Sequence, residues 1–223
     1  MSTLLVPLVS LLVTAAIIGL LFLVLVVDTG RRGKTLSATA RDLGLDYRPY
    51  ASISNRIRDA HFAIIESGQF RHFRHLLEGT FRQRSYVSVF DYSVVMPEGT
   101  STQSLLLLAC PLPGLPAFAI SKSRWLSHDA FSEGNHYRLQ PLRTDQKPLL
   151  LRQWQVLSRD PQRLWPRLTP TLCDWLLAHP HLHIEWSDGI LLVCRPGHIL
   201  APEHMGAAIE HAESLARLLQ SEQ

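Results

Sequence analysis

Residues 75–95 read HLLEGTFRQRSYVSVFDYSVV: two apolar arms separated by the polar run 82–85. The second arm is rich in β-branched and aromatic residues, a composition typical of strands, so the stretch predicts a β-hairpin. Alternation along this arm gives it two faces. One face carries Val87, Val89, Asp91, Ser93 and Val95, and the other carries Tyr86, Ser88, Phe90, Tyr92 and Val94. Because both faces are partly apolar, this arm is predicted to lie inside a sheet.

Further short apolar runs bounded by Pro, Gly or polar residues predict additional strands. A second hairpin is expected at 182–194, where Asp188 and Gly189 form the tight turn. The other expected strands are 61–66, 105–110, 117–121, 137–139 and 149–157. Helices are expected at 35–43, after Pro161, at 170–178 and from Pro202 onward, the last with an apolar stripe.

A different pattern precedes these elements, in residues 4–27. This run of 24 residues carries no charge, and as a helix it would be roughly 36 Å long, enough to cross a hydrocarbon core of about 30 Å. A cleaved signal peptide would have a charged start, a shorter run and an A-x-A-like end, none of which is present. A buried core helix is the other alternative. We predict a transmembrane anchor at 1–27 that contacts the bilayer through residues 4–27.

The residues after the span set the orientation. Arg31, Arg32 and Lys34 follow it directly, and basic residues beside a span resist translocation. They predict lipid contact here, an outside N-terminus and a cytoplasmic C-terminal domain. Gly30 and Gly33 disfavour a continuous helix, so residues 28–34 are predicted to form a basic hinge before a domain at 35–223.

The fold class that follows is α+β: an N-terminal transmembrane helix, then a mostly antiparallel sheet domain covered by helices. The formal net charge of +3 is modest and does not demand nucleic acid, which we do not expect as a partner. Three cysteines are widely spaced in apolar sequence, which favours reduced core thiols.

Four short segments carry a resemblance: ARDLGL at 40–45, Gly68, EGT at 78–80 and VFDY at 89–92. The chain resembles, over about half its length, a family of uncharacterised bacterial single-span membrane proteins with one cytoplasmic domain of unknown function. The resemblance implies an anchored domain in the inner membrane of a bacterial cell. It implies no activity and no catalytic residues.

The densest basic region lies around the first hairpin. Arg71, Arg74, Arg82 and Arg84 are candidates for surface contact, since arginines near a membrane attract anionic headgroups. The alternative is an ordinary charged hairpin end. No recognised nucleic-acid motif accompanies these residues.

A metal site is the main candidate for bound chemistry. His181, His183 and Glu185 alternate along one strand face, and imidazole and carboxylate groups are ligands of zinc or copper. The alternative is a solvated strand face, and no cofactor is predicted.

Asp91 is an acid in an apolar strand, where it would act as a general acid or base or pair with an arginine of the adjacent strand. No G-x-S-x-G, H-E-x-x-H or phosphate-binding glycine loop is present, so we name no catalytic residue. The predicted function is a non-catalytic anchored module that binds a partner protein, such as a membrane protein, or the membrane surface. The alternative is an anchored hydrolase or metal-dependent enzyme. A pocket that gathers Asp91 or the histidines would favour the enzyme, and an exposed apolar or basic patch would favour the module.

Overall fold

The computed structural model describes residue 14 and residues 30–66, 69–96, 99–122, 139–143 and 154–220. The predicted span at 4–27 lies outside the described residues except for Thr14, and most of the strand expected at 137–139 also lies outside them. Among the described residues, no helix has both the length and the apolar character needed to cross a membrane.

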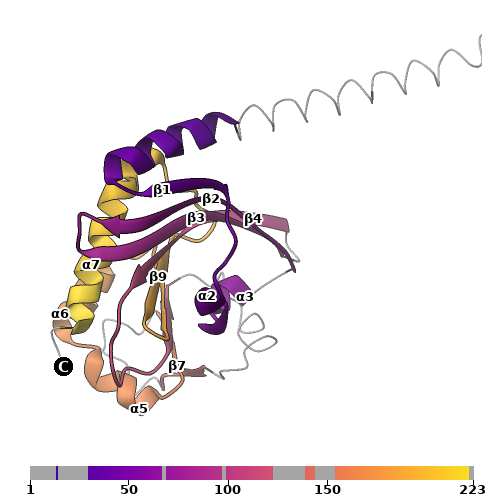
Figure 1. Ribbon diagram of the computed structural model, residues 1–223. Coiled ribbons are helices and arrows are strands. Elements are labelled where there is room, and N and C mark those ends of the chain that lie inside the picture. Colours follow the sequence, from indigo (N-terminus) through magenta and orange to yellow (C-terminus); the bar gives the residue numbers. More distant parts are fainter. Residues whose placement is uncertain are drawn as a thin grey trace, which may run out of the picture.

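A single sheet organises the described part of the chain (Figure 1). Its nine described strands have the order β1-β2-β3-β4-β9-β8-β5-β7-β6, and every neighbouring pair is antiparallel. The strands are β1 Asp46–Tyr50, β2 Gln69–Phe81, β3 Ser85–Met96, β4 Gly99–Ala109, β5 Phe118–Ser121, β6 Gln140–Pro141, β7 Gln155–Ser158, β8 His183–Ser187 and β9 Ile190–Cys194. The predicted α+β class with a mostly antiparallel sheet is confirmed.

Helices cover both faces of this sheet. They are a helix over residues 30–43, α2 Asn55–Asp59, α3 Ala63–Glu66, α5 Pro161–Leu164, α6 Pro170–Ala178 and α7 Met205–Gln220, with 3-10 turns η3 Trp165–Arg167 and η4 Pro202–His204. The helix expected at 170–178 is confirmed at those bounds. Thr169 explains its start, because its hydroxyl accepts the N–H of Leu172 and Pro170 fits the first helical turn.

Both predicted hairpins are present, and their turns fit the twist of the strands. Arg82 and Gln83 have φ values of 46° and 58°, and Asp188 and Gly189 have 48° and 75°. Two successive residues of positive φ are typical of the tight turns that join right-twisted antiparallel strands. Strand β3 pairs with β2 on one side and with β4 on the other. The prediction that the second arm of the first hairpin lies inside the sheet is therefore confirmed.

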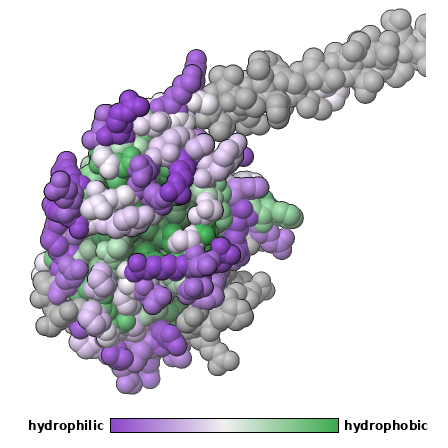
Figure 2. All heavy atoms as spheres, viewed as in Figure 1, coloured by the Kyte–Doolittle hydropathy of each residue, from purple (hydrophilic) through white to green (hydrophobic). Residues whose placement is uncertain are grey.

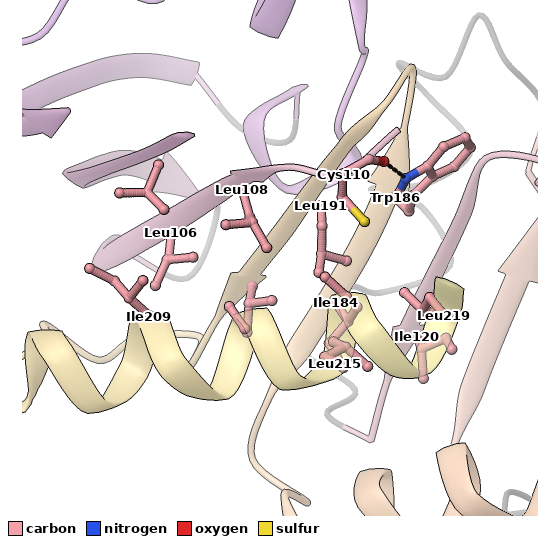
Figure 3. Packing of buried hydrophobic residues seen from close by; sticks show 14 of the residues in the cluster. Leu106, Leu108, Cys110, Ile120, Ile184, Trp186, Leu191, Ile209, Leu215 and Leu219 are labelled. Atoms are coloured by element: carbon pink, nitrogen blue, oxygen red, sulfur yellow. Dashed lines mark hydrogen bonds between the residues drawn. The ribbon is translucent and has the colours of Figure 1, made fainter. Parts of the chain in front are cut away.

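The larger core lies on the face of the sheet covered by α7. Figure 3 shows Ile209, Leu215 and Leu219 of α7 directed at the leucines of β4 and at the strands beyond it. The 30–43 helix adds Leu36 and Ala40 to the same core. The predicted apolar stripe of α7 is buried, apart from Ala208, which is half-buried. Each fully buried Leu or Ile contributes about 1.5–3 kcal/mol, so this packing fixes α7 and the 30–43 helix on the sheet.

The opposite face is covered by α2 and α3. Phe90, Tyr92 and Val94 of β3 pack there against Phe62 and Ile64. Val87 and Val89 belong to the larger core instead. The predicted division of β3 into two alternating faces is therefore confirmed.

The strand predicted at 61–66 is wrong, because Ala63–Glu66 is helical. The carboxylate of Glu185 accepts the backbone N–H groups of Ala63 and Ile64 at 2.7 and 2.9 Å. This contact supplies acceptors for the free N–H groups of a helix start. A residue 121 positions away thus overrides the β-preference of Ile64 and Ile65.

The chain at 30–34 also differs from expectation. These residues are helical and continue without a break into the helix predicted at 35–43, in place of a hinge at 28–34. Residues 28 and 29 lie outside the described part. The physical reason is tertiary: Arg32 and Gly33 are held against the sheet by the contacts described next, which outweigh the poor helix propensity of glycine.

Candidate functional site

Arg32 joins the 30–43 helix to the middle of β3. Its Nε and Nη2 atoms donate to Oδ2 and Oδ1 of Asp91 at 2.6 and 2.9 Å. The two side chains are 21% and 11% exposed. A bidentate pair of this kind fixes orientation as well as distance, because the planar guanidinium matches the carboxylate.

Two further groups close this network. Ser104 of β4 donates its hydroxyl to Asp91 Oδ1 at 2.7 Å and accepts the N–H of Leu200 at 2.9 Å. The Leu200 carbonyl accepts a hydrogen bond from Arg32 Nη2 at 3.1 Å. We call Arg32, Asp91, Ser104 and the backbone of Leu200 the Arg32 clamp. It ties together the helix, two central strands and the segment that leads into α7.

Tyr47 and His75 lie beside the clamp. The Tyr47 hydroxyl is 2.8 Å from His75 Nδ1, and the two rings stack with their centroids 6.2 Å apart. Burial lowers the pKa of His75 and raises the pKa of Tyr47, which favours the neutral form of both groups. His75 sits at an irregularity of β2 with φ of 55°, and such bulges redirect a side chain. The helix therefore rests on a neutral hydrogen-bonded pair next to an ion pair.

The two glycines of this helix test the packing. An alanine Cβ at Gly33 would lie 2.9 Å from the Tyr47 hydroxyl, whereas a Cβ at Gly30 would meet nothing within 4 Å. Gly30→Ala is expected to stabilise the protein by up to about 1 kcal/mol through helix propensity. Gly33→Ala displaces the Tyr47 hydroxyl from His75 and loses about 1 kcal/mol, which cancels that gain.

Chemical denaturation of the two glycine variants beside the unchanged protein measures this difference. Equal stabilisation by both substitutions would contradict the packing of Tyr47 on the helix.

The basic residues predicted to contact lipid after the span fall into two groups. Arg31 and Lys34 are exposed, and hydrophilic side chains cover the outward side of the 30–43 helix in Figure 2. Arg32 is half-buried and engaged in the clamp. Arg32 is therefore a structural residue here, and the orientation and lipid contact predicted for the three residues stay predictions.

The four arginines of the first hairpin also divide. Arg82 and Arg84, at the hairpin turn, form ion pairs with Glu210 and Glu213 of α7. Arg71 and Arg74 are exposed near the start of β2. The guanidinium of Arg71 donates to the Glu66 carbonyl, and Arg74 pairs with no acidic side chain of the described part. The four residues thus form two separate surfaces at opposite ends of β2.

Sequence reasoning missed the apolar residues around Arg71 and Arg74. Tyr50 and Phe70 are 81% and 73% exposed, and Val95 is 40% exposed. Tyr50 lies opposite Arg74 in the register, and Val95 lies opposite Gln69. Three of the seven exposed large hydrophobic residues of the described part gather at this place. We call residues 69–74 with Tyr50 and Val95 the 69–74 edge. The alternation of apolar and polar residues does not show which side chains at the edge of a sheet are exposed, so the sequence did not predict this surface.

The three predicted metal ligands do not form a site. His181 is exposed, while His183 and Glu185 are 0% and 3% exposed in their side chains. His183 Nε2 lies 2.7 Å from Glu185 Oε1, and the rest of that carboxylate is occupied by the N–H groups of α3. Within the described residues no group of three or more His, Cys, Asp or Glu side chains is placed to hold a metal ion.

The solvated strand face, the alternative to the metal site, is wrong for His183 and Glu185. Both faces of β8 are covered, because α3 lies over the side that sequence alternation assigned to solvent. A buried carboxylate is tolerated there since it accepts three hydrogen bonds.

A cleft and a shallow groove are present among the described residues, and the candidate catalytic groups line neither of them. A cleft of about 130 Å³ lies between the segment 51–57 and strands β2, β3, β4 and β9. It is mostly apolar, with Arg56, Glu78 and Tyr86 among its lining. A shallow groove between α6 and α7 is lined by Trp175 and Arg217. In the described part, neither cavity is lined by Asp91, His183 or Glu185.

The cysteines are free and buried, which confirms the predicted core thiols. Burial raises the pKa of Cys110 to about 11 and raises the pKa of Cys194 well above its usual range. Because the thiolate is the reactive species, a disulfide reagent at pH 8 is expected to modify none of the three thiols within minutes. All three react once the protein is unfolded in urea. A fast-reacting thiol in the folded protein would contradict this burial.

Comparisons with known proteins concern the fold. No protein-family model matches the chain, and a search of curated proteins found no match. Among solved structures, the crystal structure of the mycobacterial trehalose monomycolate transport factor A, TtfA, is similar, with a TM-score of 0.55 and 12% identity over 85% of this chain and 92% of that chain. The likeness is one of fold. The resemblance of the sequence to a bacterial single-span family stays a prediction.

Proposed function

We propose that the chain is a membrane-anchored, non-catalytic module, with residues 4–27 as a single transmembrane anchor and the α+β domain on the cytoplasmic side of a bacterial inner membrane. The module binds a membrane protein partner or the membrane surface. The observation that carries the proposal is the Arg32 clamp: Arg32, five residues after the predicted span, is tied to the sheet.

The clamp supports an anchored role through its geometry. A flexible hinge would let the domain move freely relative to the bilayer, whereas a helix fixed by a bidentate ion pair gives the domain a defined pose. The exposed Arg31 and Lys34 lie in this same helix. Their charge is the kind that an anionic cytoplasmic leaflet attracts.

Two further observations support binding over catalysis. Neither the cleft at 51–57 nor the groove between α6 and α7 is lined by Asp91, His183 or Glu185. Three of the seven exposed large hydrophobic residues of the described part lie with Arg71 and Arg74 at the 69–74 edge, as in interaction surfaces.

Membrane fractionation of the full-length chain tests the anchor. We expect the protein to stay in the membrane pellet after alkaline carbonate washing. Leu12→Arg with Ile18→Arg places two charges inside the predicted span, each unfavourable by about 2.5–3.5 kcal/mol, and is expected to move the protein to the supernatant.

Ile199→Arg, at an exposed position of the domain, is the matched control and should leave the protein in the pellet. Release of the unchanged chain by carbonate, or no effect of the two arginines, would refute the anchor.

A further inference from the structure

We propose that the 69–74 edge docks on the anionic surface of the bilayer, with Phe70 and Tyr50 entering the headgroup region and Arg71 and Arg74 contacting lipid phosphates. This inference rests on the proposed anchor and names the surface and the partner that the anchor brings together.

The direction of the 30–43 helix places this edge near the point where the chain arrives. Arg32 and Gly33 lie over Asp91 and His75, while Leu45, just after the helix, lies against Gly79 further along β2. The helix therefore runs toward the hairpin turn, and its residue-30 end points toward the start of β2. Figure 1 shows the same arrangement, with that end of the helix above the side of the sheet where β2 begins. A membrane anchor before residue 30 is thus on the side of the 69–74 edge.

The backbone at Phe70 supports a role for its side chain. Phe70 has φ of 49°, a conformation that is unfavourable for a bulky residue. It lies within the irregularity of β2 between Gln69 and His72, and it is 73% exposed. Bulges redirect side chains, and unfavourable backbone conformations concentrate at functional positions. At this unfavourable backbone position the aromatic ring of Phe70 is exposed to water, which gives an apolar ring no stabilising contact.

The charges around Phe70 select the kind of partner. Arg71 lies on the α3 side of the sheet, since it contacts Glu66. Arg74 lies on the side of the 30–43 helix, because it is opposite Asp91 in the register. Asp91 is already paired with Arg32, so the positive charge of Arg74 is left without a described acidic partner. Two arginines flanking exposed aromatic rings match an anionic lipid interface, where aromatic rings sit at headgroup depth.

The other end of the hairpin provides the contrast. Arg82 and Arg84 carry the same charge, yet both are paired with acids of α7. Tyr86, at 51% exposure, is the exposed aromatic residue of that end. These residues are the matched controls for Arg71, Arg74 and Phe70.

The test uses the full-length chain in nanodiscs of phosphatidylcholine alone or with phosphatidylglycerol. Phe70→Cys carries an environment-sensitive fluorophore, and Tyr86→Cys carries the same label as the control. The three native thiols are buried, so they are expected to react slowly with the label. We expect doxyl-labelled lipids to quench the label at position 70 in the anionic nanodiscs and to leave the label at position 86 unquenched.

Charge variants complete the experiment. Arg71→Gln with Arg74→Gln in the labelled Phe70→Cys protein is expected to lower the ratio of docked to undocked protein about fivefold for each arginine, roughly 25-fold together. Arg82→Gln with Arg84→Gln should change it less than about twofold, because these side chains are held by α7. Quenching at position 70 that is absent, or equal in the two lipid compositions, overturns the docking surface and leaves the anchor intact. A chain that does not enter the nanodiscs at all overturns the anchor and the docking surface together.

Discussion

Asp91→Ala is expected to lower the free energy of unfolding by about 3 kcal/mol and to release the 30–43 helix from the sheet. Removal of one partner of a largely buried pair leaves the other charge uncompensated, which costs about 3–5 kcal/mol; the partial exposure of Arg32 places this pair at the lower end. Hydrogen exchange of the helix amides measures the release, and urea denaturation measures the stability.

Two companion variants make the Asp91 prediction specific. Ser104→Ala removes one hydrogen bond to Asp91 and is expected to cost about 1 kcal/mol. Arg32→Ala combined with Asp91→Ala should cost clearly less than the sum of the two single variants, because the second removal has no charge left to expose. Additive effects, or unchanged exchange in the helix, would show that the clamp does not hold it.

Glu185→Ala is the second large effect that we expect, a loss of about 3–5 kcal/mol with local unfolding of α3. The carboxylate accepts two backbone N–H groups of α3 and contacts His183 Nε2. Its loss leaves buried donors without an acceptor, each costing about 1–3 kcal/mol. Thermal unfolding, together with exchange of the Ala63 and Ile64 amides, measures both parts of the effect.

Glu185→Gln keeps the shape and one acceptor oxygen, so it is expected to be less harmful than Glu185→Ala. Glu210→Ala, which removes an exposed ion pair with Arg82, should change stability by less than about 1 kcal/mol. A Glu185→Ala protein as stable as the Glu210→Ala protein would be incompatible with a role of Glu185 as the cap of α3.

Local sequence signals were enough to predict the hairpins and helices whose determining residues lie close together in the chain. The 75–95 stretch forms the second half of β2 and nearly all of β3, since alternation and turn residues act over a few positions. Pro170 and the residues around it predicted α6 because capping is also local. The apolar stripe of α7 predicted a buried face correctly, since a helix of that length has one side to bury.

The contacts that sequence reasoning could not predict join distant residues. Asp91 was expected to act as an acid or base or to pair with an arginine of the adjacent strand, but it pairs with Arg32, 59 residues earlier. Glu185 was assigned to a metal or to solvent, but it caps a helix 121 residues away. Only the packed sheet brings these groups together. The two carboxylates explain why residues 63–66 are helical instead of a strand and why residues 30–34, the described part of the predicted hinge, are helical.

The surface needed the fold as well. Four arginines around one hairpin carry the same charge in the sequence and all four are exposed, yet acids of α7 pair with Arg82 and Arg84 and not with Arg71 and Arg74. No strand and no exposed apolar residue were predicted at 69–74, and the irregularity of β2 and the exposure of Phe70 appear only in the fold. The arginines of the sequence therefore located the basic region, but only the ion pairs with α7 distinguish Arg82 and Arg84 from Arg71 and Arg74.

The sidedness of the two chain ends tests the central proposal most directly. A single cysteine at Ser2 or at Gln220 is treated in intact cells with a membrane-impermeant maleimide, while the native thiols stay buried. We predict labelling of the Ser2→Cys protein in intact cells, and labelling of the Gln220→Cys protein only after the cells are broken. Labelling of Gln220→Cys in intact cells, or of neither position until lysis, would contradict an anchored domain on the cytoplasmic side.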